Sequence, residues 1–282
     1  MMRRWHVVAL ALLAVLALAC ESAGTAGSKP GGGSTKTNLP SSMAALGDSI
    51  TAGFGTCLAL VICQRRSWST GGDATVDSHY RRILDDNPKI KGKAHNYSDP
   101  GADAADLAGQ AESAVKAKVQ YVTVLIGGND ICAPTINGMT PVRTFRDRID
   151  AGLRELKKGL PKARVLLVSI PDMYRLWQVG HDEPAAVRAW NRGVCPSLLA
   201  NPTSTAAADN NRRRQVDKRV DAYNKELAAA CRAYGKKCRW DEGRVHSVRF
   251  SLDDLNHLDY FHPNTEGQRN LAEATYPRRF NW

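Results

Sequence analysis

The sequence contains no C-x-x-C pair and no cluster of histidines, the spacings in which proteins commonly hold a zinc ion. Its N-terminal apolar run at residues 7–19 is 13 residues long, whereas a membrane-spanning helix needs about 20. No internal repeat and no break in composition divides the 282 residues, of which 43% are hydrophobic. We therefore expect one large domain without a metal centre.

The N-terminus has the pattern of a secretory signal, because two arginines precede the apolar run. Residues 16–20 resemble a bacterial lipobox in which the Leu and the small residue are exchanged. A lipobox cysteine is acylated, so Cys20 is the candidate anchor, and ordinary secretory cleavage near this position is the alternative. We expect a signal peptide at 1–20, a flexible Gly/Ser/Thr-rich tether at 21–42 and the folded domain at 43–282. The protein would then be exported, either secreted or held at the cell surface.

Seven cysteines are an odd number, which in an exported chain leaves one to explain. If Cys20 is acylated or removed, six remain. Two pairs are close neighbours that flank predicted loops, which leaves one long-range pair. We expect three disulfides formed in an oxidising compartment, with free buried thiols as the alternative, and the expected pairs are Cys57–Cys63, Cys231–Cys238 and Cys132–Cys195.

The formal net charge is +11, with arginine runs at 212–214 and 278–279. Such an excess favours contact with an anionic surface. Nucleic acid is an unsuitable partner for an exported, disulfide-bearing chain without interleaved aromatic residues. An anionic lipid head group or an envelope polymer fits better, and a charged surface that only maintains solubility is the alternative. The sequence does not indicate an oligomeric state, and a monomer is favoured.

Apolar segments alternate with helix-like segments along the chain. The clearest strand lies in residues 119–132, where β-branched and apolar residues run continuously into two glycines. Residues 172–212 contain several helix breakers and predict an irregular excursion with short helices. Further strands are expected at 43–47, 94–98, 163–171 and 236–242, and helices at 76–86, 103–118, 141–158, 215–234 and after Asn264 or Thr265. The pattern predicts an α/β fold with a doubly wound parallel sheet of about five strands.

Polar residues follow several of these strands. Ser49 comes directly after the first strand, where it is either an exposed nucleophile or the N-cap of a helix. Gly101 and Asn129 follow two further strands and would reach the same carboxyl edge of the sheet. His262 lies three residues after Asp259, so a loop can place the carboxylate against Nδ1 of the imidazole and direct Nε2 to Ser49. A loop histidine and two turn residues without a catalytic role are the alternative interpretation.

Four short blocks in this order resemble those of the SGNH, or GDSL, hydrolases: GDS at 47–49, the glycine of PGA at 101, GGND at 127–130 and DYFH at 259–262. The resemblance covers residues 43–282. It implies a flavodoxin-like three-layer α/β/α sandwich and serine ester hydrolysis through an acyl-enzyme, without a metal or cofactor. The G-x-S-x-G sequence of the α/β hydrolases is absent around Ser49. By this resemblance Ser49 is the nucleophile, His262 the base and Asp259 its orienting group, and the N–H groups of Ser49 and Gly101 with the Asn129 amide form the oxyanion hole.

Further segments are similar to the animal phospholipase B-like branch of that family and its secreted bacterial relatives: residues 64–73, 126–132 and Cys195-Pro196. This similarity predicts lipase, phospholipase or esterase activity on an ester or phospholipid substrate. A carbohydrate O-acetyl esterase acting on envelope polymers is an alternative, for which Trp68, Trp177 and Trp190 could stack on sugars. A non-catalytic, surface-binding lipoprotein on the same fold is the alternative from another class.

Overall fold

The structure is a computed structural model that describes residues 38–57 and 59–282. The predicted signal peptide, Cys20 and most of the predicted tether lie outside the described residues.

The last residues of the predicted tether contact the domain. The Ser41 N–H donates to Gln120 Oε1 at 2.8 Å, and the Asn87 side chain donates to the carbonyl oxygens of Leu39 and Pro40. Polar contacts of this kind leave no periodic pattern of apolar residues, so the sequence did not predict them. The folded part of the chain therefore includes residues just before position 43.

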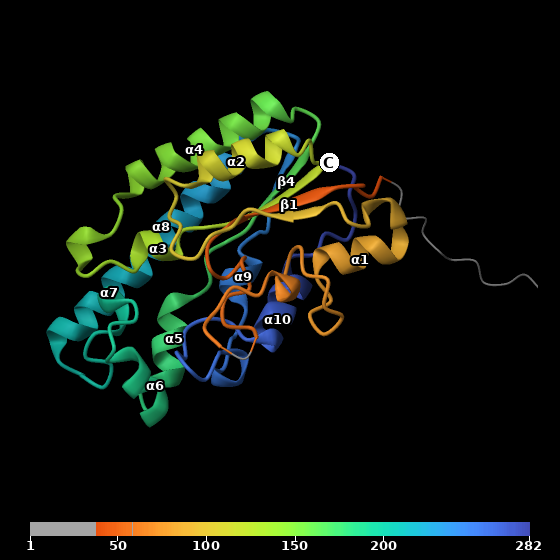
Figure 1. Cartoon of the computed structure of the whole chain (residues 1–282). Coiled ribbons are helices and arrows are strands. Elements are labelled where there is room, and N and C mark those ends of the chain that lie inside the picture. The colour runs from red at the N-terminus through yellow and green to blue at the C-terminus, as the bar shows by residue number, and fades with distance from the viewer. Residues whose placement is uncertain (1–37, 58) are drawn as a thin grey trace, which may run out of the picture. The chain divides into compact units, whose positions relative to one another are not determined.

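A single sheet of five parallel strands forms the centre of the domain, in the order β2-β1-β3-β4-β5 (Figure 1). The central strand β3 and its neighbour β1 are buried at every position, because helices cover both faces of the sheet. The predicted α/β class and strand number are confirmed. The strands are β1 (Met43–Gly47), β2 (Ala94–Asn96), β3 (Tyr121–Leu125), β4 (Arg164–Leu167) and β5 (Cys238–Trp240).

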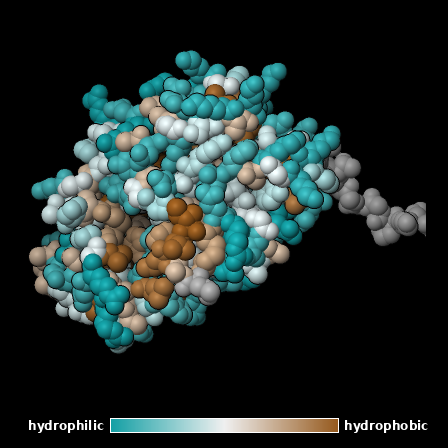
Figure 2. Space-filling view, viewed as in Figure 1, coloured by the Kyte–Doolittle hydropathy of each residue, from teal (hydrophilic) through white to brown (hydrophobic). Residues whose placement is uncertain are grey.

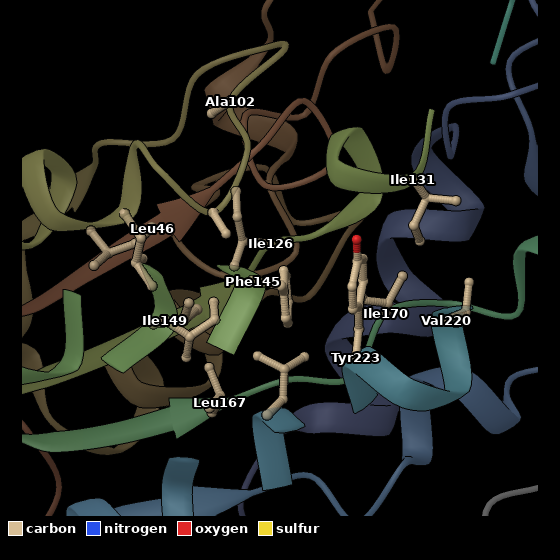
Figure 3. Close-up of a cluster of buried hydrophobic side chains, with 14 of the residues drawn as sticks. Leu46, Ala102, Ile126, Ile131, Phe145, Ile149, Leu167, Ile170, Val220 and Tyr223 are labelled. Carbon is tan, nitrogen blue, oxygen red and sulfur yellow. The ribbon is translucent and has the colours of Figure 1, made fainter. Parts of the chain in front are cut away.

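Helices cover the sheet as two layers (Figure 1). On one face lie α2 (Leu107–Lys116), α4 (Val142–Gly159) and α8 (Ala207–Tyr234), and on the other α1 (His79–Asp86), α9 (Arg244–Ser247) and α10 (Thr265–Thr275). Apolar side chains fill the space between the first layer and the sheet (Figure 3), where the rings of Phe145 and Tyr223 stack with centroids 4.0 Å apart. The result is the predicted three-layer sandwich.

Short helices lie in residues 172–212, as expected for this segment. They are α5 (Met173–Gly180), α6 (Pro184–Trp190) and α7 (Pro196–Leu199), and Figure 1 shows them together beyond one end of the sheet. The remaining short elements are α3 (Gly128–Ile131) and the 3-10 turns Gln64–Arg66, Pro88–Ile90, Ile136–Gly138 and Leu252–Asp254.

Three helices begin three or more residues away from the predicted start, among them α1, which begins at His79 rather than at Val76. Helix α8 begins at Ala207 rather than near 215, because tertiary contacts of the buried Arg213 stabilise a first turn that has no apolar stripe. The Arg213 guanidinium lies 4.3 Å from the Trp177 ring centroid and donates to the carbonyl oxygens of Asn201 and Ser204. Helix α2 begins at Leu107, several residues after the predicted cap.

The three disulfides pair the cysteines as predicted: Cys57–Cys63, Cys132–Cys195 and Cys231–Cys238. The second of these joins the turn after β3 to the start of α7, and so ties the short-helix segment to the sheet. No described helix is long and apolar enough to cross a membrane. The described residues also contain no group of three or more His, Cys, Asp or Glu side chains that could hold a metal ion.

Candidate active site

The end of β1 is shaped by a glycine that no other residue can replace. Gly47 has φ 150°, and a Cβ at this position would lie 2.1 Å from the carbonyl oxygen of Leu125 on the neighbouring strand. The Gln110 side chain binds both backbone groups of Gly47, since its Nε2 donates to the Gly47 oxygen at 2.9 Å and its Oε1 accepts from the Gly47 N–H at 2.7 Å. The chain therefore leaves the sheet here in a defined direction, with Ser49 two residues later.

Ser49, His262 and Asp259 form a continuous hydrogen-bonded row. Ser49 Oγ lies 2.9 Å from His262 Nε2, and His262 Nδ1 lies 2.7 Å from Asp259 Oδ2. With the imidazole proton on Nδ1, the serine hydroxyl donates to Nε2 and Nδ1–H donates to the carboxylate. Asp259 and Ser49 are each 7% exposed, so little water competes for these bonds. The arrangement can transfer the serine proton to the imidazole.

Side chains that bind backbone groups hold the loop that carries Asp259 and His262. Asp259 Oδ1 accepts the N–H groups of Phe261 and His262 at 2.9 and 3.1 Å, so the carboxylate closes a turn across the three-residue spacing. Trp190 Nε1 donates to the carbonyl oxygen of Tyr260 at 3.1 Å. One oxygen of Asp259 therefore stabilises the loop while the other contacts the imidazole.

Asn129 lies in α3, the short helix that follows β3. Its position depends on Gly127, which has φ 121° and whose Cβ would lie 2.6 Å from Ile170 Cδ1. Asn129 Nδ2 donates one hydrogen to the carbonyl oxygen of Ala102 at 2.8 Å, and the residue lines the same cavity as Ser49. An amide has two such hydrogens, so the second one stays available to a ligand.

Gly101 lies in the loop after β2 with φ 89°, a conformation that favours glycine. It lines a hollow together with Asp99 and Gln110, beside the cavity at Ser49 rather than within it. The N–H groups of Gly101 and Ser49 donate to no acceptor among the described residues. The contribution of both N–H groups to an oxyanion hole stays a prediction.

The cavity at Ser49 is mainly apolar. Its polar members are Asp48, Ser49, Asn129 and Asp172. Figure 2 shows a hollow on the viewed face with hydrophobic surface beside it. The apolar lining residues are Ile50, Leu125, Ile170, Pro171, Met173, Leu176, Val179, Phe250, Leu255, Phe261 and Pro263. Several of them come from α5 and the loops around it, which explains why the short-helix segment matters for the site.

Two buried carboxyl groups beside the row received no role from the sequence. Asp48 is 2% exposed, its Oδ1 accepts the Ile50 N–H at 3.0 Å, and burial raises its pKa to about 6. Asp130 Oδ2 accepts the Ala104 N–H at 2.9 Å, while its Oδ1 has no hydrogen-bond partner and lies 3.6 Å from Arg148. Burial raises the pKa of Asp130 as well. The sequence signal that could have identified these two residues is their position after the strands β1 and β3.

The model of the GDSL-like Lipase/Acylhydrolase family matches residues 45–269 of the chain. Among curated proteins, the chain is similar to membrane-associated phospholipase B1 of Rattus norvegicus, with 30% identity over 190 residues, and of Mus musculus, with 31% identity over 192 residues. Each match covers 55% of this chain and 13% of the relative, so the chain spans only a small part of these longer proteins.

Two solved structures share the fold. A GDSL-like lipase from Parabacteroides merdae matches with a TM-score of 0.53 and 16% identity, over 82% of this chain and 92% of that one. An acetyl-xylooligosaccharide esterase from Geobacillus matches with a TM-score of 0.51 and 16% identity, over 83% of this chain and 91% of that one. At this identity the likeness concerns the fold alone.

Proposed function

The chain belongs to the GDSL-like lipase/acylhydrolase family and is a serine ester hydrolase, and from this premise we propose that it cleaves lipid esters with Ser49 as its nucleophile. The observation that supports this role most directly is the row of hydrogen bonds from Ser49 through His262 to Asp259, at 2.9 and 2.7 Å. In the proposed reaction Ser49 Oγ attacks the ester carbonyl carbon, and its proton passes to His262 Nε2. Asp259 holds the imidazole in the required tautomer and stabilises the imidazolium.

The tetrahedral intermediate then collapses. Its C–O bond to the alcohol breaks, and the imidazolium at His262 gives its proton to the departing oxygen. The acyl group stays on Ser49 as an ester until a water molecule, deprotonated by the same imidazole, attacks it and releases the acid. The cycle returns Ser49 and His262 to their starting states.

The oxyanion would be bound by the Asn129 amide and by the N–H groups of Ser49 and Gly101. Two observations support this assignment: the bond from Asn129 to Ala102 joins the two loops, and the N–H groups of Ser49 and Gly101 donate to no other described residue. Each donor of this kind contributes about 3 kcal/mol to transition-state stabilisation. Asn129 is the donor whose removal we expect to reduce the rate most clearly.

The apolar cavity beside Ser49 supports a fatty acyl group as the part of the substrate that is bound. Its side chains, among them Leu176, Val179 and Phe250, would exclude water from a hydrocarbon chain and offer few partners to a sugar. The similarity to membrane-associated phospholipase B1 supports a phospholipid or related lipid ester as substrate.

A carbohydrate acetyl esterase is the second candidate, and the tryptophans weigh against it. Trp68 and Trp190 are 0% and 1% exposed, so neither offers a face for sugar stacking. Trp177 lies under the Arg213 guanidinium and donates its Nε1–H to the carbonyl oxygen of Pro202. These rings are engaged in packing.

We also propose that residues 1–20 are a lipoprotein-type signal peptide that directs the domain to an oxidising compartment, with the following residues as a tether. The three disulfides support export, since such bonds persist under oxidising conditions. Cell fractionation tests the anchor: Cys20→Ala should move the protein from the membrane fraction to the soluble one. An unchanged distribution would exclude acylation of Cys20 as the anchor.

A fluorophosphonate probe tests the nucleophile directly. The wild type should be labelled and Ser49→Ala should not, whereas Ser113→Ala, which removes a hydroxyl that bonds only to its own helix, should be labelled normally. Labelling of Ser49→Ala at the wild-type rate would refute the assignment. A series of p-nitrophenyl esters tests the acyl group, and a clear preference for acetate over long chains would refute the lipid ester.

A further inference from the structure

Hydrophobic exposure in the domain is concentrated at one place. Among the described residues, the large hydrophobic side chains that are exposed are Leu60, Val61, Ile62 and Leu258, at 39%, 51%, 50% and 53%. We call these four residues the apolar rim. Three of them are consecutive and lie inside the loop that the Cys57–Cys63 disulfide closes. The fourth belongs to the loop of Asp259 and His262.

The two parts of the apolar rim are joined at Asn256. The Gly55 N–H donates to the Val61 oxygen at 3.0 Å, and a side chain at Gly55 would meet Leu60 Cδ2 at 3.5 Å and Asn256 Nδ2 at 2.9 Å. Asn256 Nδ2 donates to the Gly55 oxygen, and Asn256 Oδ1 accepts the Leu258 N–H at 2.7 Å. One buried side chain therefore connects both loops.

Asn256 also connects the apolar rim to the proposed base, since its N–H donates to the His262 oxygen at 2.8 Å. Leu255 and Phe261, which lie in the same loop as Leu258, line the cavity at Ser49. Figure 2 shows hydrophobic side chains gathered on this face beside a hollow. The exposed apolar side chains thus stand next to the site that would take an acyl chain.

Resting on the proposed function, we propose that the apolar rim docks on the surface of a lipid aggregate, a bilayer or micelle, and so holds the cavity at the interface where its substrate lies. Lipid esters with long chains are aggregated in water, so an acyl chain must leave an aggregate to reach Ser49. Exposed apolar side chains beside that cavity would shorten the path through water. The disulfide closes the loop of Val61 in advance, so docking orders little additional chain.

Charge contributes less than apolar contact at this surface. The groove beside Leu258 contains Arg66 and Arg269, but Arg66 is paired with Asp73 and Arg269 with Glu266. The excess positive charge of the whole chain, +11, adds a general attraction to anionic head groups. We therefore expect binding to neutral vesicles and stronger binding to anionic ones.

Vesicle sedimentation tests the docking surface, using the full chain with Cys20→Ala and Ser49→Ala so that neither an N-terminal lipid nor hydrolysis interferes. Vesicles of phosphatidylcholine, with and without phosphatidylglycerol, are the probe. Val61→Asp with Ile62→Asp should lower the partition coefficient about tenfold or more on both vesicle types. Val61→Ser with Ile62→Ser should lower it in the same direction without changing charge.

The matched control is Lys116→Gln with Lys118→Gln, which lowers the net charge by the same amount at the end of α2, the end that leads to the start of β3. This control should bind neutral vesicles like the parent protein. If the rim variants also bind like the parent, or if the parent binds neither vesicle type, the docking proposal is wrong. It is also wrong if sedimentation velocity shows that the rim variants separate a dimer of the parent, because the apolar rim would then be an interface between two copies.

Catalysis separates this proposal from the proposed function. With Ser49 restored, the aspartate variant should hydrolyse monomeric p-nitrophenyl butyrate at the parent rate and lose about tenfold or more on vesicle phospholipid at limiting lipid. Equal loss on both substrates would overturn the docking role. A parent protein that hydrolyses no ester at all would refute the proposed function, while the sedimentation result would still decide the docking surface.

Discussion

Two pairs of residues are proposed to act with Ser49, His262 with Asp259 and Asn129 with Gly101. We call them the two sides of Ser49, and they are positioned in different ways. On one side, His262 and Asp259 lie in a single loop, three residues apart. His262 Nε2 lies 2.9 Å from Ser49 Oγ, and Asp259 Oδ2 lies 2.7 Å from His262 Nδ1. On the other side, Asn129 and Gly101 come from the ends of different strands. Their relative position depends on contacts between two loops rather than on their own spacing in sequence. The first side is therefore specified locally and the second by tertiary structure.

Asp259→Asn tests the local side and should have the largest effect of this set. The amide keeps an acceptor for the N–H groups of Phe261 and His262, so the loop should persist, but its NH2 group favours the wrong imidazole tautomer. We expect kcat to fall about 10³- to 10⁴-fold, measured with a soluble p-nitrophenyl ester. Asp253→Asn, at an exposed position of the same region, is the control and should keep the parent rate. A loss of less than about tenfold would show that Asp259 does not orient the base.

Asn129→Ala tests the other side. Removal of one oxyanion donor should reduce kcat about 10²- to 10³-fold with little change in KM, because the bond forms only as charge develops on the carbonyl oxygen. Asn137→Ala, an exposed position after the same strand, is the matched control. If Asn129→Ala retains the parent kcat, the assignment of Asn129 as an oxyanion donor is wrong.

The same difference explains what could be predicted from the sequence. The order of strands and helices followed from runs such as residues 119–132, where burial on both faces requires continuous apolar residues. The cysteine pairs followed from their spacing, and the structure contains the same pairs. Features that depend on local pattern were thus accessible without coordinates.

Features that depend on tertiary contact were not accessible. The early start of α8 depends on the buried Arg213, whose partners lie in a loop before the helix. Gly101 follows β2 at the same edge as Ser49, but the sequence did not indicate that it lines a different hollow from the cavity at Ser49, which is lined by α5 and the segments around it. Asp48 and Asp130 showed no spacing signal, because their roles arise from burial.

Asp48 directly precedes Ser49 in the chain and is buried. Its raised pKa makes the free energy of unfolding depend on pH. In the unfolded chain this carboxyl group loses its proton near pH 3.8, whereas in the folded chain it keeps the proton up to about pH 6. Between these values the folded state binds the extra proton, so the free energy of unfolding should fall as pH rises through this window and stay lower above it.

Asp48→Asn cannot titrate and should remove this decline. The free energy of unfolding of the parent, relative to that of the variant, should fall by about 2 kcal/mol between pH 4 and pH 6, as measured by urea denaturation at both pH values and at pH 5. Asp253→Asn provides the control for loss of an exposed carboxylate. Parallel pH profiles of the parent and Asp48→Asn would contradict the prediction.

Asp130 offers the finest test of the comparison, because we expect it to affect the proposed oxyanion donors by positioning the loop of Gly101. Its carboxylate accepts the Ala104 N–H at 2.9 Å, while Asn129 bonds to Ala102 two residues earlier, so both side chains hold the loop of Gly101. Asp130→Ala should displace that loop slightly and lower kcat about tenfold. Asp130→Asn keeps an acceptor and should recover most of the rate, which a general loss of stability would not predict.

A double-mutant cycle separates the two sides of Ser49. If Asp130 positions the Gly101 loop, Asp130→Ala should cost less in an Asn129→Ala background than in the parent, since the contacts that both residues make to one loop are not independent. In an Asp259→Asn background its cost should be unchanged, because the loop of His262 shares no partner with it. Equal costs in all three backgrounds would mean that Asp130 stabilises the fold without positioning the oxyanion donors.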